Sequence, residues 1–541
     1  MDGPVDWPTR DLLAHRRSTA PDRTALVDVD DGRRYTYREL DREVDRWASA
    51  LETTIEECGS SSGSEADGSR SEWRQTTSGD RDVALRVATL VDTRPEFVAL
   101  FFAAMRIGVT LVPLNVRETP PELEAKLERT EPTLLVCEAE TASLALESWE
   151  GEIRSIDEPT DRGIEQLRPA SSPSTDEGPT GGSLDRTDTQ LVMFTSGTSG
   201  VPKAVRLTVG NLVASATTSA FRLGVSPEDR WLCCLPIYHM GGLAPVVRSA
   251  VYETTVVLQR SFEPGVTARI LEEYDVTGVS LVPTMLKRLL DSGWAPSDSL
   301  RFVLLGGAPA SSELLDRCFD ADVPVYPTYG MTEAASQIAT ATPEEARSYK
   351  GTVGRPLGFT DVAVVDDDGS PLQPGEVGEL VIFGPTVTPG YLDGGHTENA
   401  FCDAPAHRNG RGLRTGDVGY RDSGGRLWVV NRKTDRIVTG GENVDPGEVA
   451  DVLEAHPEID VAAVVGLPDN EWGERVAALL VSAVSEEPPS HASIFEHCEG
   501  RLASFKRPKT VAYTDSLPRT PSDTVDREAV RKRLRSADDE R

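Results

Sequence analysis

The chain carries one loop of unusual composition, Phe194-Thr-Ser-Gly-Thr-Ser-Gly-Val-Pro-Lys203, directly after an apolar run that predicts a short buried strand. Such a loop exposes backbone N–H groups, supplies hydroxyls that rotate to meet oxygens, and ends in a cation. These are the requirements for holding a polyphosphate. Ser/Gly loops are more often flexible surface segments. Here the flanking strand, Lys203 and the motifs that follow later in the sequence favour phosphate binding.

Length and charge restrict the class of protein. At 541 residues the chain is long enough for two or more domains. Its net charge of −32 argues against nucleic-acid partners and against anionic membranes. Only eight of its 56 basic residues are lysine, and this acidic, lysine-poor composition is typical of proteins adapted to high salt.

Localisation and redox state are inferred from what the sequence does not contain. No apolar run reaches membrane-spanning length and no basic-then-apolar leader is seen, so we expect a cytoplasmic protein without membrane insertion. None of the seven cysteines has C-x-x-C spacing, and the seven histidines are dispersed. Neither a zinc site nor a disulfide framework is therefore expected.

Strands and helices alternate through the first two thirds of the chain, which predicts a parallel sheet covered by helices. The expected strands there are 24–29, 34–37, 83–91, 110–114, 190–194, 230–236, 276–283, 302–309 and 323–327, and the expected helices are 38–51, 96–106, 121–127 and 212–221. Two polar stretches, about 58–82 and 156–187, are predicted to be mobile loops, because they contain too few apolar residues to offset the entropy of ordering.

The pattern changes in the last third. Short strands and glycine turns over 352–430 predict a small antiparallel barrel or sheet. A further alternation follows, with helices at 446–455 and 492–503 and strands at 461–465, 475–481 and 510–514. We place a domain boundary near Arg432–Asp435, which divides the chain into an N-terminal domain, 1–432, and a C-terminal domain, 433–541.

Several motifs occur in one order: the loop ending at Lys203, Gly306–Pro309, Thr328–Glu333, Thr415–Asp417 and Val438–Asn443. Together they resemble the acyl-adenylate-forming ligase superfamily of AMP-binding enzymes over roughly residues 20–535. The resemblance implies an α/β fold, with a large N-terminal domain of stacked αβ sheets plus a small β-barrel and a small α+β C-terminal domain that rotates on a hinge. It also implies a reaction in which a carboxylic acid and ATP form acyl-AMP, which passes its acyl group to the thiol of coenzyme A.

The resemblance assigns an ATP site. The phosphates are assigned to Thr195, Ser196, Gly197, Thr198, Ser199, Gly200 and Lys203. The adenine is assigned to Gly306, Gly307, Ala308, Pro309, Thr328, Tyr329, Gly330 and Met331. Thr332 is placed near the α-phosphate, Glu333 as the Mg²⁺ ligand, and Asp417 with Arg432 on the ribose. Taken singly, the glycines are also typical of strand-ending turns, Glu333 of a helix cap, and the last two of solvated side chains.

A narrower resemblance is to the o-succinylbenzoate–CoA ligases of menaquinone biosynthesis. It rests on Tyr329–Gln337 and on Pro236–Leu243 with Arg248 beyond it. Arg248 lies in an apolar stretch and needs a partner, either the second carboxylate of the acid or a carboxylate of the protein. The other residues expected to contact the acid are His239, for which a satisfied core histidine is the alternative, and Gly307, Ser336 and Gln337.

The C-terminal domain is expected to serve the second half-reaction. By resemblance, Thr434 is the hinge, and Gly440, Gly441 and Glu442 line the thiol tunnel. A β-hairpin turn at these last residues is compatible with that role. The sequence leaves the oligomeric state open, with a homo-oligomer as one option.

One motif departs from the family pattern. Asp523 and Thr524 occupy the positions of the family's Gly and of its catalytic Lys, which normally bridges the reacting carboxylate and the α-phosphate. Three interpretations stay open. Lys506, Lys509 or Arg519 substitutes for that lysine; adenylation is slow but adequate; or the chain binds nucleotide or acyl-CoA without turnover. A medium-chain or aryl acid is the alternative substrate.

Overall fold

The computed structural model describes residues 11–61, 85–159, 161, 163–170, 184–195, 202–403, 411–433, 435, 437–439, 442–469, 472–483, 488–499, 501–520 and 524–539. These residues form two compact units. The first runs to Asp361 and includes Ile382–Leu413, and the second comprises Val362–Val381 and the described residues from Arg414 onward. The predicted boundary near Arg432–Asp435 stays a prediction.

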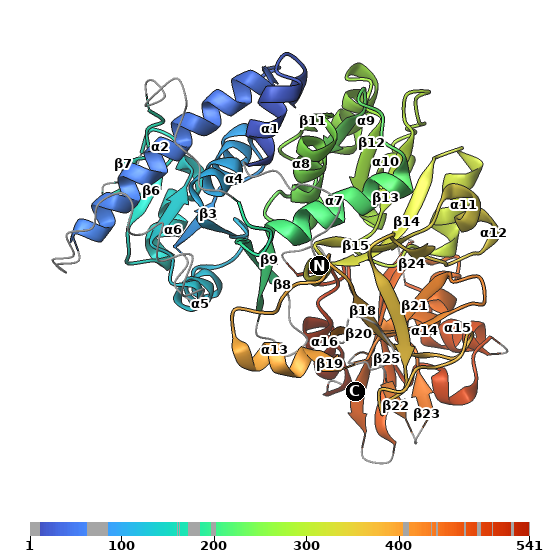
Figure 1. Ribbon diagram of the computed structural model, residues 1–541. Coiled ribbons are helices and arrows are strands. Elements are labelled where there is room, and N and C mark those ends of the chain that lie inside the picture. Colours follow the sequence, from blue (N-terminus) through green and yellow to red (C-terminus); the bar gives the residue numbers. More distant parts are fainter. Residues whose placement is uncertain are drawn as a thin grey trace. The chain divides into compact units, whose positions relative to one another are not determined.

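The first unit contains a seven-stranded sheet within the described residues, coloured mainly blue to cyan in Figure 1. Its strands in spatial order are β7 (Glu165–Gln166), β6 (Ile153–Ser155), β5 (Leu134–Cys137), β3 (Arg86–Leu90), β4 (Thr110–Pro113), β8 (Thr189–Thr195) and β9 (Lys203–Thr208). All neighbours are parallel except β8 and β9, which form an antiparallel pair. The associated helices are α2 (Tyr37–Ser61), α4 (Pro95–Ile107), α5 (Pro120–Thr130) and α6 (Ala142–Ser148), with a 3-10 turn at η1 (Ala139–Thr141).

The same unit contains a nine-stranded sheet within the described residues. Its order is β16 (Arg355–Pro356), β15 (Ser336–Thr340), β14 (Val325–Met331), β13 (Phe302–Leu305), β12 (Gly278–Leu281), β10 (Arg230–Cys233), β11 (Thr255–Leu258), β1 (Thr24–Asp28) and β2 (Arg34–Thr36). The strands from β14 to β1 are parallel, and the edge strands are antiparallel. Its helices are α1 (Leu12–Thr19), α7 (Val209–Leu223), α8 (Met240–Tyr252), α9 (Pro264–Glu273), α10 (Pro283–Asp291), α11 (Ser312–Asp320), α12 (Pro343–Ser348) and the 3-10 turn η2 (Thr332–Ala334). Helix α13 (Gly394–Ala400) precedes β19 and contacts it.

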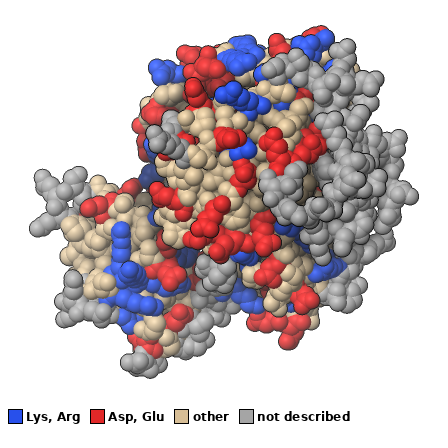
Figure 2. All heavy atoms as spheres, turned by 90° about the vertical axis from the view of Figure 1, so that its left-hand side faces the viewer, with Lys and Arg blue, Asp and Glu red and all other residues tan. Residues whose placement is uncertain are grey.

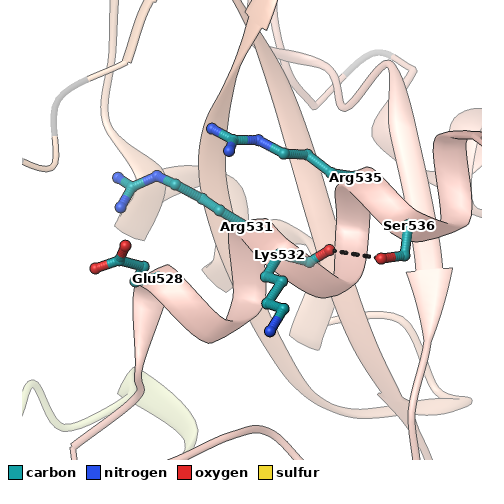
Figure 3. Close-up of a pocket in the computed structure, with 5 residues that line it drawn as sticks. All are labelled: Glu528, Arg531, Lys532, Arg535 and Ser536. Atoms are coloured by element: carbon teal, nitrogen blue, oxygen red, sulfur yellow. Dashed lines mark hydrogen bonds between the residues drawn. The ribbon is translucent and has the colours of Figure 1, made fainter.

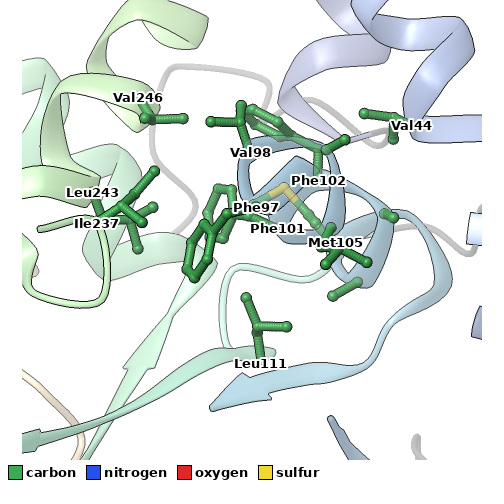
Figure 4. Packing of buried hydrophobic residues seen from close by; sticks show 14 of the residues in the cluster. Val44, Phe97, Val98, Phe101, Phe102, Met105, Leu111, Ile237, Leu243 and Val246 are labelled. Atoms are coloured by element: carbon green, nitrogen blue, oxygen red, sulfur yellow. The ribbon is translucent and has the colours of Figure 1, made fainter. Parts of the chain in front are cut away.

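Helix α4 lies at the centre of the main core. It starts at Pro95, whose fixed φ suits a first helical turn, and it ends at Gly108, which caps it with φ 72°. Every residue from Phe97 to Ile107 is buried, and all of them except Arg106 are apolar. It packs with α8 and with strands of both sheets in one cluster, and Figure 4 shows Phe97, Phe101 and Met105 in this cluster. The two sheets are therefore joined through a layer of helices.

The predicted polar loops differ from the structure at their edges. Helix α2 continues to Ser61, so residues 58–61 are helical, and residues 62–82 lie outside the described part. In the second loop, Ile156, Ile164 and Leu167 are buried and β7 adds to the sheet. These three apolar residues anchor a stretch whose average composition is polar. Residues 171–183 lie outside the described part.

The predicted small antiparallel barrel or sheet corresponds to a five-stranded sheet of β17 (Asp361–Val365), β18 (Gly378–Phe383), β20 (Arg411–Arg421), β19 (Phe401–Asp403) and β21 (Leu427–Arg432). Another sheet, which lies wholly within the second unit, consists of β23 (Glu442–Val444), β22 (Ile437–Thr439), β25 (Gly473–Ser482), β24 (Ile459–Asp469) and β26 (Thr510–Tyr513), with α14 (Pro446–Glu454), α15 (His491–Cys498), η3 (Ser504–Lys506) and α16 (Arg527–Asp539). Strand β24 is longer than predicted because it pairs with β25 along its whole length.

Charges are distributed in small groups. On the face in Figure 2, acidic side chains form several separate groups with basic side chains between them. Inside the first unit, the guanidinium of Arg106 is buried and bonds to the carboxylates of Asp11, Asp41 and Asp45 at 2.5–3.1 Å. Among the described helices, none is both long and apolar enough to cross a membrane.

Candidate functional site

The predicted phosphate loop connects β8 to β9. Thr195 ends β8 and lies opposite Lys203, which begins β9. The predicted ligands between them, Ser196, Gly197, Thr198, Ser199 and Gly200, lie outside the described residues. The hairpin thus brings the hydroxyl of Thr195 and the lysine to the same end of the sheet.

Helix α5 contacts both stems of this loop. Lys126 Nζ lies 5.1 Å from the centre of the Phe194 ring, at the end of β8. Arg129 donates a hydrogen bond to the carbonyl of Pro202, just before β9. One helix therefore holds the two ends of the loop relative to each other.

The predicted adenine segment follows β13, next to the end of β14. A Cβ at Gly306 would lie 2.6 Å from Thr328 Cγ2, so the two strands approach this closely only with glycine there. Gly307 has φ 82°, which again favours glycine, and residues 307–309 are exposed. The structure therefore brings Gly306 and Thr328 together at the carboxyl ends of parallel strands, where open α/β sheets bind ligands.

The strand predicted over 323–327 continues beyond Pro327. Strand β14 continues through Tyr329 to Met331 and pairs with β15, with a register shift between Tyr329 and Gly330. A Cβ at Gly330 would lie 2.0 Å from the Ser336 carbonyl oxygen. The pairing with β15 supplies backbone hydrogen bonds that a polar sequence did not indicate.

The predicted metal carboxylate is buried. Thr332 and Glu333 lie in η2, and Glu333 is 6% exposed. Its Oε1 accepts a hydrogen bond of 3.1 Å from the hydroxyl of Tyr391. Lys203 Nζ lies 5.3 Å from the centre of the same Tyr391 ring. Lys203 and Glu333, which are distant in sequence, thus both contact Tyr391. The sequence did not predict this tyrosine, because its only local signal is the Gly-Tyr pair after β18.

The donor set at Glu333 fits magnesium bound together with phosphates. The described residues contain no group of three or more His, Cys, Asp and Glu side chains that could hold a metal ion. Mg²⁺ needs no such cage, because it keeps several waters and binds through one or two carboxylates plus phosphate oxygens. A single buried carboxylate near the phosphate loop's lysine meets that requirement.

Arg248 lies on α8 and is 2% exposed. Its Nη2 donates to Ser336 Oγ at 3.1 Å and to Gln337 Oε1 at 2.8 Å, both neutral acceptors. Its Nε is buried without a hydrogen-bond partner, and it forms no ion pair with a described carboxylate. Burial lowers the pKa of the guanidinium to about 10. The predicted alternative, a carboxylate partner from the protein, is therefore absent among the described residues.

The surroundings of Arg248 hold it in place. The guanidinium lies 5.0 Å from the centre of the Trp231 ring, whose indole N–H donates to Ser280. Gln337 Oε1 also accepts a 2.7 Å hydrogen bond from Ser219. Neither Trp231 nor Ser219 was predicted, because neither lies in a recognised motif. They fix the arginine without neutralising it.

The backbone at Ser336 is strained. Ser336 has φ 126°, a conformation that favours glycine, and Ala335 before it has φ 51°. The hydroxyl of Ser215 donates to the Ala335 carbonyl at 2.8 Å and helps to hold this turn. Strain of this kind is concentrated at ligand-binding sites, and here it directs Ser336 Oγ to Arg248.

His239 is the N-cap residue of α8. Its Nε2 is buried and has no hydrogen-bond partner among the described residues, unlike a satisfied core histidine. Burial, together with the positive charges of Lys126 and Arg117, lowers the pKa of the imidazole to about 4. The ring is therefore neutral at pH 7, with one nitrogen available to a ligand.

In the second unit, Asp417 and Arg432 face each other across β20 and β21. The carboxylate of Asp417 is buried and its Oδ1 lies 3.1 Å from Nε of Arg432, whose side chain is 46% exposed. Thr415 Oγ1 accepts the Asp417 N–H at 3.0 Å. The structure thus brings together the two residues predicted to contact the ribose.

The remaining predicted residues of this unit are only partly described. Thr434, Gly440, Gly441 and Asp523 lie outside the described residues, as does the side chain of Glu442, whose backbone begins β23. Thr524 is described. Its hydroxyl lies 2.7 Å from that of Thr520, and its carbonyl accepts the Thr520 N–H. Thr524 is therefore bonded to Thr520 and brings no charge to this position.

The three basic residues that could substitute for the family's catalytic lysine differ in their surroundings. Lys506 Nζ donates to both carboxylate oxygens of Glu448, at 2.7 and 2.6 Å. Lys509 Nζ lies 4.1 Å from the centre of the Trp472 ring. Arg519 pairs with Val525 through the backbone. Lys506 is therefore neutralised in this conformation, whereas Lys509 faces an aromatic ring.

One cavity lies away from these residues. It measures about 520 Å³ and lies on α16. Figure 3 shows the side chains that line it, which are Glu528, Arg531, Lys532, Arg535 and Ser536. None of the predicted site residues lines it.

Comparisons with known sequences give consistent results. A model of the AMP-binding enzyme family matches residues 78–392, and one of the AMP-binding enzyme C-terminal domain matches residues 448–523. The chain is 38% identical to a 2-succinylbenzoate–CoA ligase of Bacillus licheniformis over 440 residues, 81% of this chain and 87% of the relative. It is 35% identical to that of Bacillus velezensis over 515 residues, 95% and 96% of the two chains.

Solved structures agree with the predicted fold class. The o-succinylbenzoate CoA synthetase from Bacillus subtilis, in complex with its acyl-adenylate intermediate, matches with a TM-score of 0.81 at 31% identity, covering 97% of this chain and 98% of that one. The same enzyme in complex with ATP and magnesium also gives 0.81 at 31% identity, covering 98% and 100%. The predicted fold class is confirmed.

Proposed function

This chain belongs to the family of AMP-binding enzymes, and from that premise we propose that it is an ATP-dependent acid–CoA ligase whose acid is 2-succinylbenzoate. A carboxylate oxygen of the acid attacks the α-phosphorus of ATP, the bond to the β-phosphate breaks, and pyrophosphate leaves. The thiol sulfur of coenzyme A then attacks the acyl carbon, the thiol proton is lost, and AMP leaves with the electrons of the C–O bond.

The residues of the first unit supply the proposed adenylation site. Lys203 and the loop before it bind the phosphates, and Thr332 lies toward the α-phosphate. Mg²⁺, when bound, neutralises phosphate charge, and Glu333 is its proposed ligand. The exposed rim of Gly306–Pro309 beside Thr328 receives the adenine, which fits glycines that permit close approach.

Residues of the second unit complete the proposal. Asp417 and Arg432 contact the ribose, Thr434 is the hinge, and Gly440, Gly441 and Glu442 line the thiol tunnel. The division into 1–432 and 433–541 belongs to the same proposal. What supports it is the resemblance of the motifs and, for the ribose pair, the contact between the two side chains.

One observation carries the choice of acid. Arg248 is fully buried, is bonded only to neutral oxygens among the described residues, and keeps one N–H without a partner. Burying an uncompensated charge costs several kcal/mol. A second carboxylate on the substrate would supply the missing counter-charge, and 2-succinylbenzoate carries one besides the reacting group. His239, with its free ring nitrogen, is proposed to contact the acid beside it.

The test compares acids with one and two carboxylates. We expect the wild type to release pyrophosphate faster with 2-succinylbenzoate than with a benzoate or a fatty acid. Arg248→Ala should lose about 30- to 1000-fold in kcat/KM for 2-succinylbenzoate, since truncating a buried charged partner costs about 2–4 kcal/mol, and less than 10-fold for monocarboxylates. Equal losses on both classes would contradict the carboxylate contact and favour a medium-chain or aryl acid.

A second candidate function rests on Thr524. Because the hydroxyl of Thr524 bonds to Thr520 and carries no charge, the chain is alternatively a nucleotide- or acyl-CoA-binding homologue without turnover. Loss of a charge at a developing anion costs orders of magnitude in rate. Release of pyrophosphate by the wild type would eliminate this alternative.

The cellular setting is also part of the proposal. All seven cysteines are free, which suits a reducing compartment such as the cytoplasm. The net charge of −32 suits a medium of high salt, where self-repulsion is screened. We expect activity to rise with KCl up to molar concentrations, and an optimum below 0.1 M would contradict the adaptation to salt.

A further inference from the structure

The segment Thr388–Leu392 lies between the strand that carries Lys203 and the turn that carries Glu333. Two main-chain hydrogen bonds of 3.1 and 2.8 Å join it to β9, and a third of 2.7 Å runs from Thr388 to the carbonyl of Glu333. Tyr391 sits in this segment and bridges to Val205 of β9. Its backbone is therefore tied to both predicted catalytic elements.

The backbone of Tyr391 is fixed on its own side as well. Gly390 before it has φ 146°, and a Cβ there would lie 2.6 Å from the side chain of Thr397. The Tyr391 N–H donates to Thr397 Oγ1 at 2.9 Å. The ring is thus set by a turn that glycine makes possible.

The Tyr391 side chain has two distinct functions available to it. It is 4% exposed, and its hydroxyl donates to Glu333 Oε1 at 3.1 Å. Its ring lies 5.3 Å from Lys203 Nζ, within the range of a cation–π contact.

We propose that Tyr391 is a positioning residue, which holds the carboxylate of Glu333 toward Mg²⁺ and the ammonium of Lys203 toward the phosphates of the same nucleotide. The inference rests on the proposed function and assigns to it a residue outside its motifs. A carboxylate that binds a metal is oriented by the groups hydrogen-bonded to it, and losing such a partner costs about 10- to 100-fold in metal affinity or activity.

The two functions separate in two variants. Tyr391→Phe removes the hydroxyl and keeps the ring. In EDTA, its affinity for ATP should stay within about 2-fold of that of the wild type. The Mg²⁺ gain, which is the factor by which Mg²⁺ raises the affinity for ATP, should be about 10- to 100-fold smaller than in the wild type. Tyr391→Leu removes both the hydroxyl and the aromatic ring, and it should also lower the affinity for ATP in EDTA. Calorimetric titration of ATP with and without Mg²⁺ measures both quantities independently of turnover.

A matched control is Tyr37→Phe. Tyr37 is an equally buried tyrosine of the same unit, and its hydroxyl donates to the carbonyls of Ser249 and Thr254. Its loss should lower thermal stability and leave the Mg²⁺ gain unchanged. In a Glu333→Gln background the Mg²⁺ gain is already absent, so Tyr391→Phe should add no more than about 2-fold.

The outcomes separate the two claims. A wild type without any Mg²⁺ gain, or Glu333→Gln with the full gain, would overturn the proposed function at this site. If those two behave as expected and Tyr391→Phe keeps the wild-type gain, the positioning role is wrong. Should Tyr391→Phe not fold, Thr397→Val, which frees the Tyr391 N–H, must show a smaller loss of the Mg²⁺ gain, and an unchanged gain would contradict the role.

Discussion

Replacing Arg248 by methionine should make the unliganded protein more stable while removing its preference for a dicarboxylic acid. Methionine is unbranched like the stem of arginine, carries no charge and has flexible torsions that fill irregular gaps. Even a buried charge that has a counter-charge can often be replaced, together with its partner, by apolar residues without loss of stability, and a charge without one is costlier still. Arg248 is such a charge, with hydrogen bonds to Ser336 and Gln337 but no described carboxylate.

The magnitude follows from the pKa. Burial lowers the pKa of the Arg248 guanidinium from 12.5 to about 10, and each factor of ten in proton affinity corresponds to about 1.4 kcal/mol. The folded state therefore binds this proton less tightly than the unfolded state. The cost, roughly 3 kcal/mol, is fully present below pH 10 and disappears only as the pH rises toward 12.5. Two lost hydrogen bonds offset part of the gain, at about 1 kcal/mol each.

The net expectation is a gain of about 1 kcal/mol for Arg248→Met at pH 7. Arg106→Met is the matched control, because Arg106 is also buried but bonds to three carboxylates. Removing it leaves those carboxylates unpaired and should cost at least about 3 kcal/mol. The two substitutions are chemically identical and are expected to change stability in opposite directions.

Thermal unfolding in the same salt, with and without 2-succinylbenzoate, is the assay. Saturating acid at 100 times its Kd should stabilise the wild type by about 2.7 kcal/mol and Arg248→Met by much less. A loss of more than about 2 kcal/mol in unliganded Arg248→Met would contradict this prediction, since it would mean that the guanidinium is already compensated within the protein.

Further predictions concern other parts of the site. Lys203→Ala should reduce ATP–pyrophosphate exchange by at least 100-fold, since a cation at the phosphates is lost, and a mild effect would count against the phosphate loop. Gly330→Ala should lower the Tm or prevent folding, because its Cβ would meet the Ser336 carbonyl at 2.0 Å. Thr524→Lys should raise the single-turnover adenylation rate, and an unchanged rate would mean that another group already serves. Burial lowers the pKa of His239 to about 4, so between pH 6.5 and 4 the unfolded state binds a proton that the folded state does not. Stability is therefore lost as the pH falls through this range. The stability of His239→Gln should lack this part of the pH dependence.

The sequence predicted the elements that have strong local signals. The apolar runs at β8, β10, β12 and β13 were recognised because buried parallel strands are continuous in their hydrophobicity. The predicted strand 190–194 corresponds to β8, whereas β9 after the loop was not predicted. The phosphate role of that loop stays a prediction. Residues such as Gly306 and Thr328 were assigned to the same ligand by resemblance, and the structure brings them into contact at the end of the sheet.

The sequence could not reveal contacts that depend on tertiary placement. Tyr391 meets Glu333 and Lys203 only because the segment after β18 lies along β9. The strand character of Thr328–Met331 comes from pairing with β15 and contradicts a polar local pattern. Likewise, the absence of a described carboxylate at Arg248 required the positions of every neighbouring side chain. The contacts of Tyr391 and Arg248 join residues at least 58 positions apart, whereas the β14–β15 pairing joins residues only 5 to 12 positions apart.

The central claim is that this chain ligates 2-succinylbenzoate to coenzyme A through an acyl-adenylate. The most direct measurement is incubation of the purified protein with 2-succinylbenzoate, ATP, Mg²⁺ and coenzyme A in molar KCl, followed by mass spectrometry. We predict 2-succinylbenzoyl-CoA, AMP and pyrophosphate in equal amounts, with acyl-AMP accumulating when coenzyme A is omitted. No pyrophosphate from this acid, or from any of a panel of acids, would contradict it.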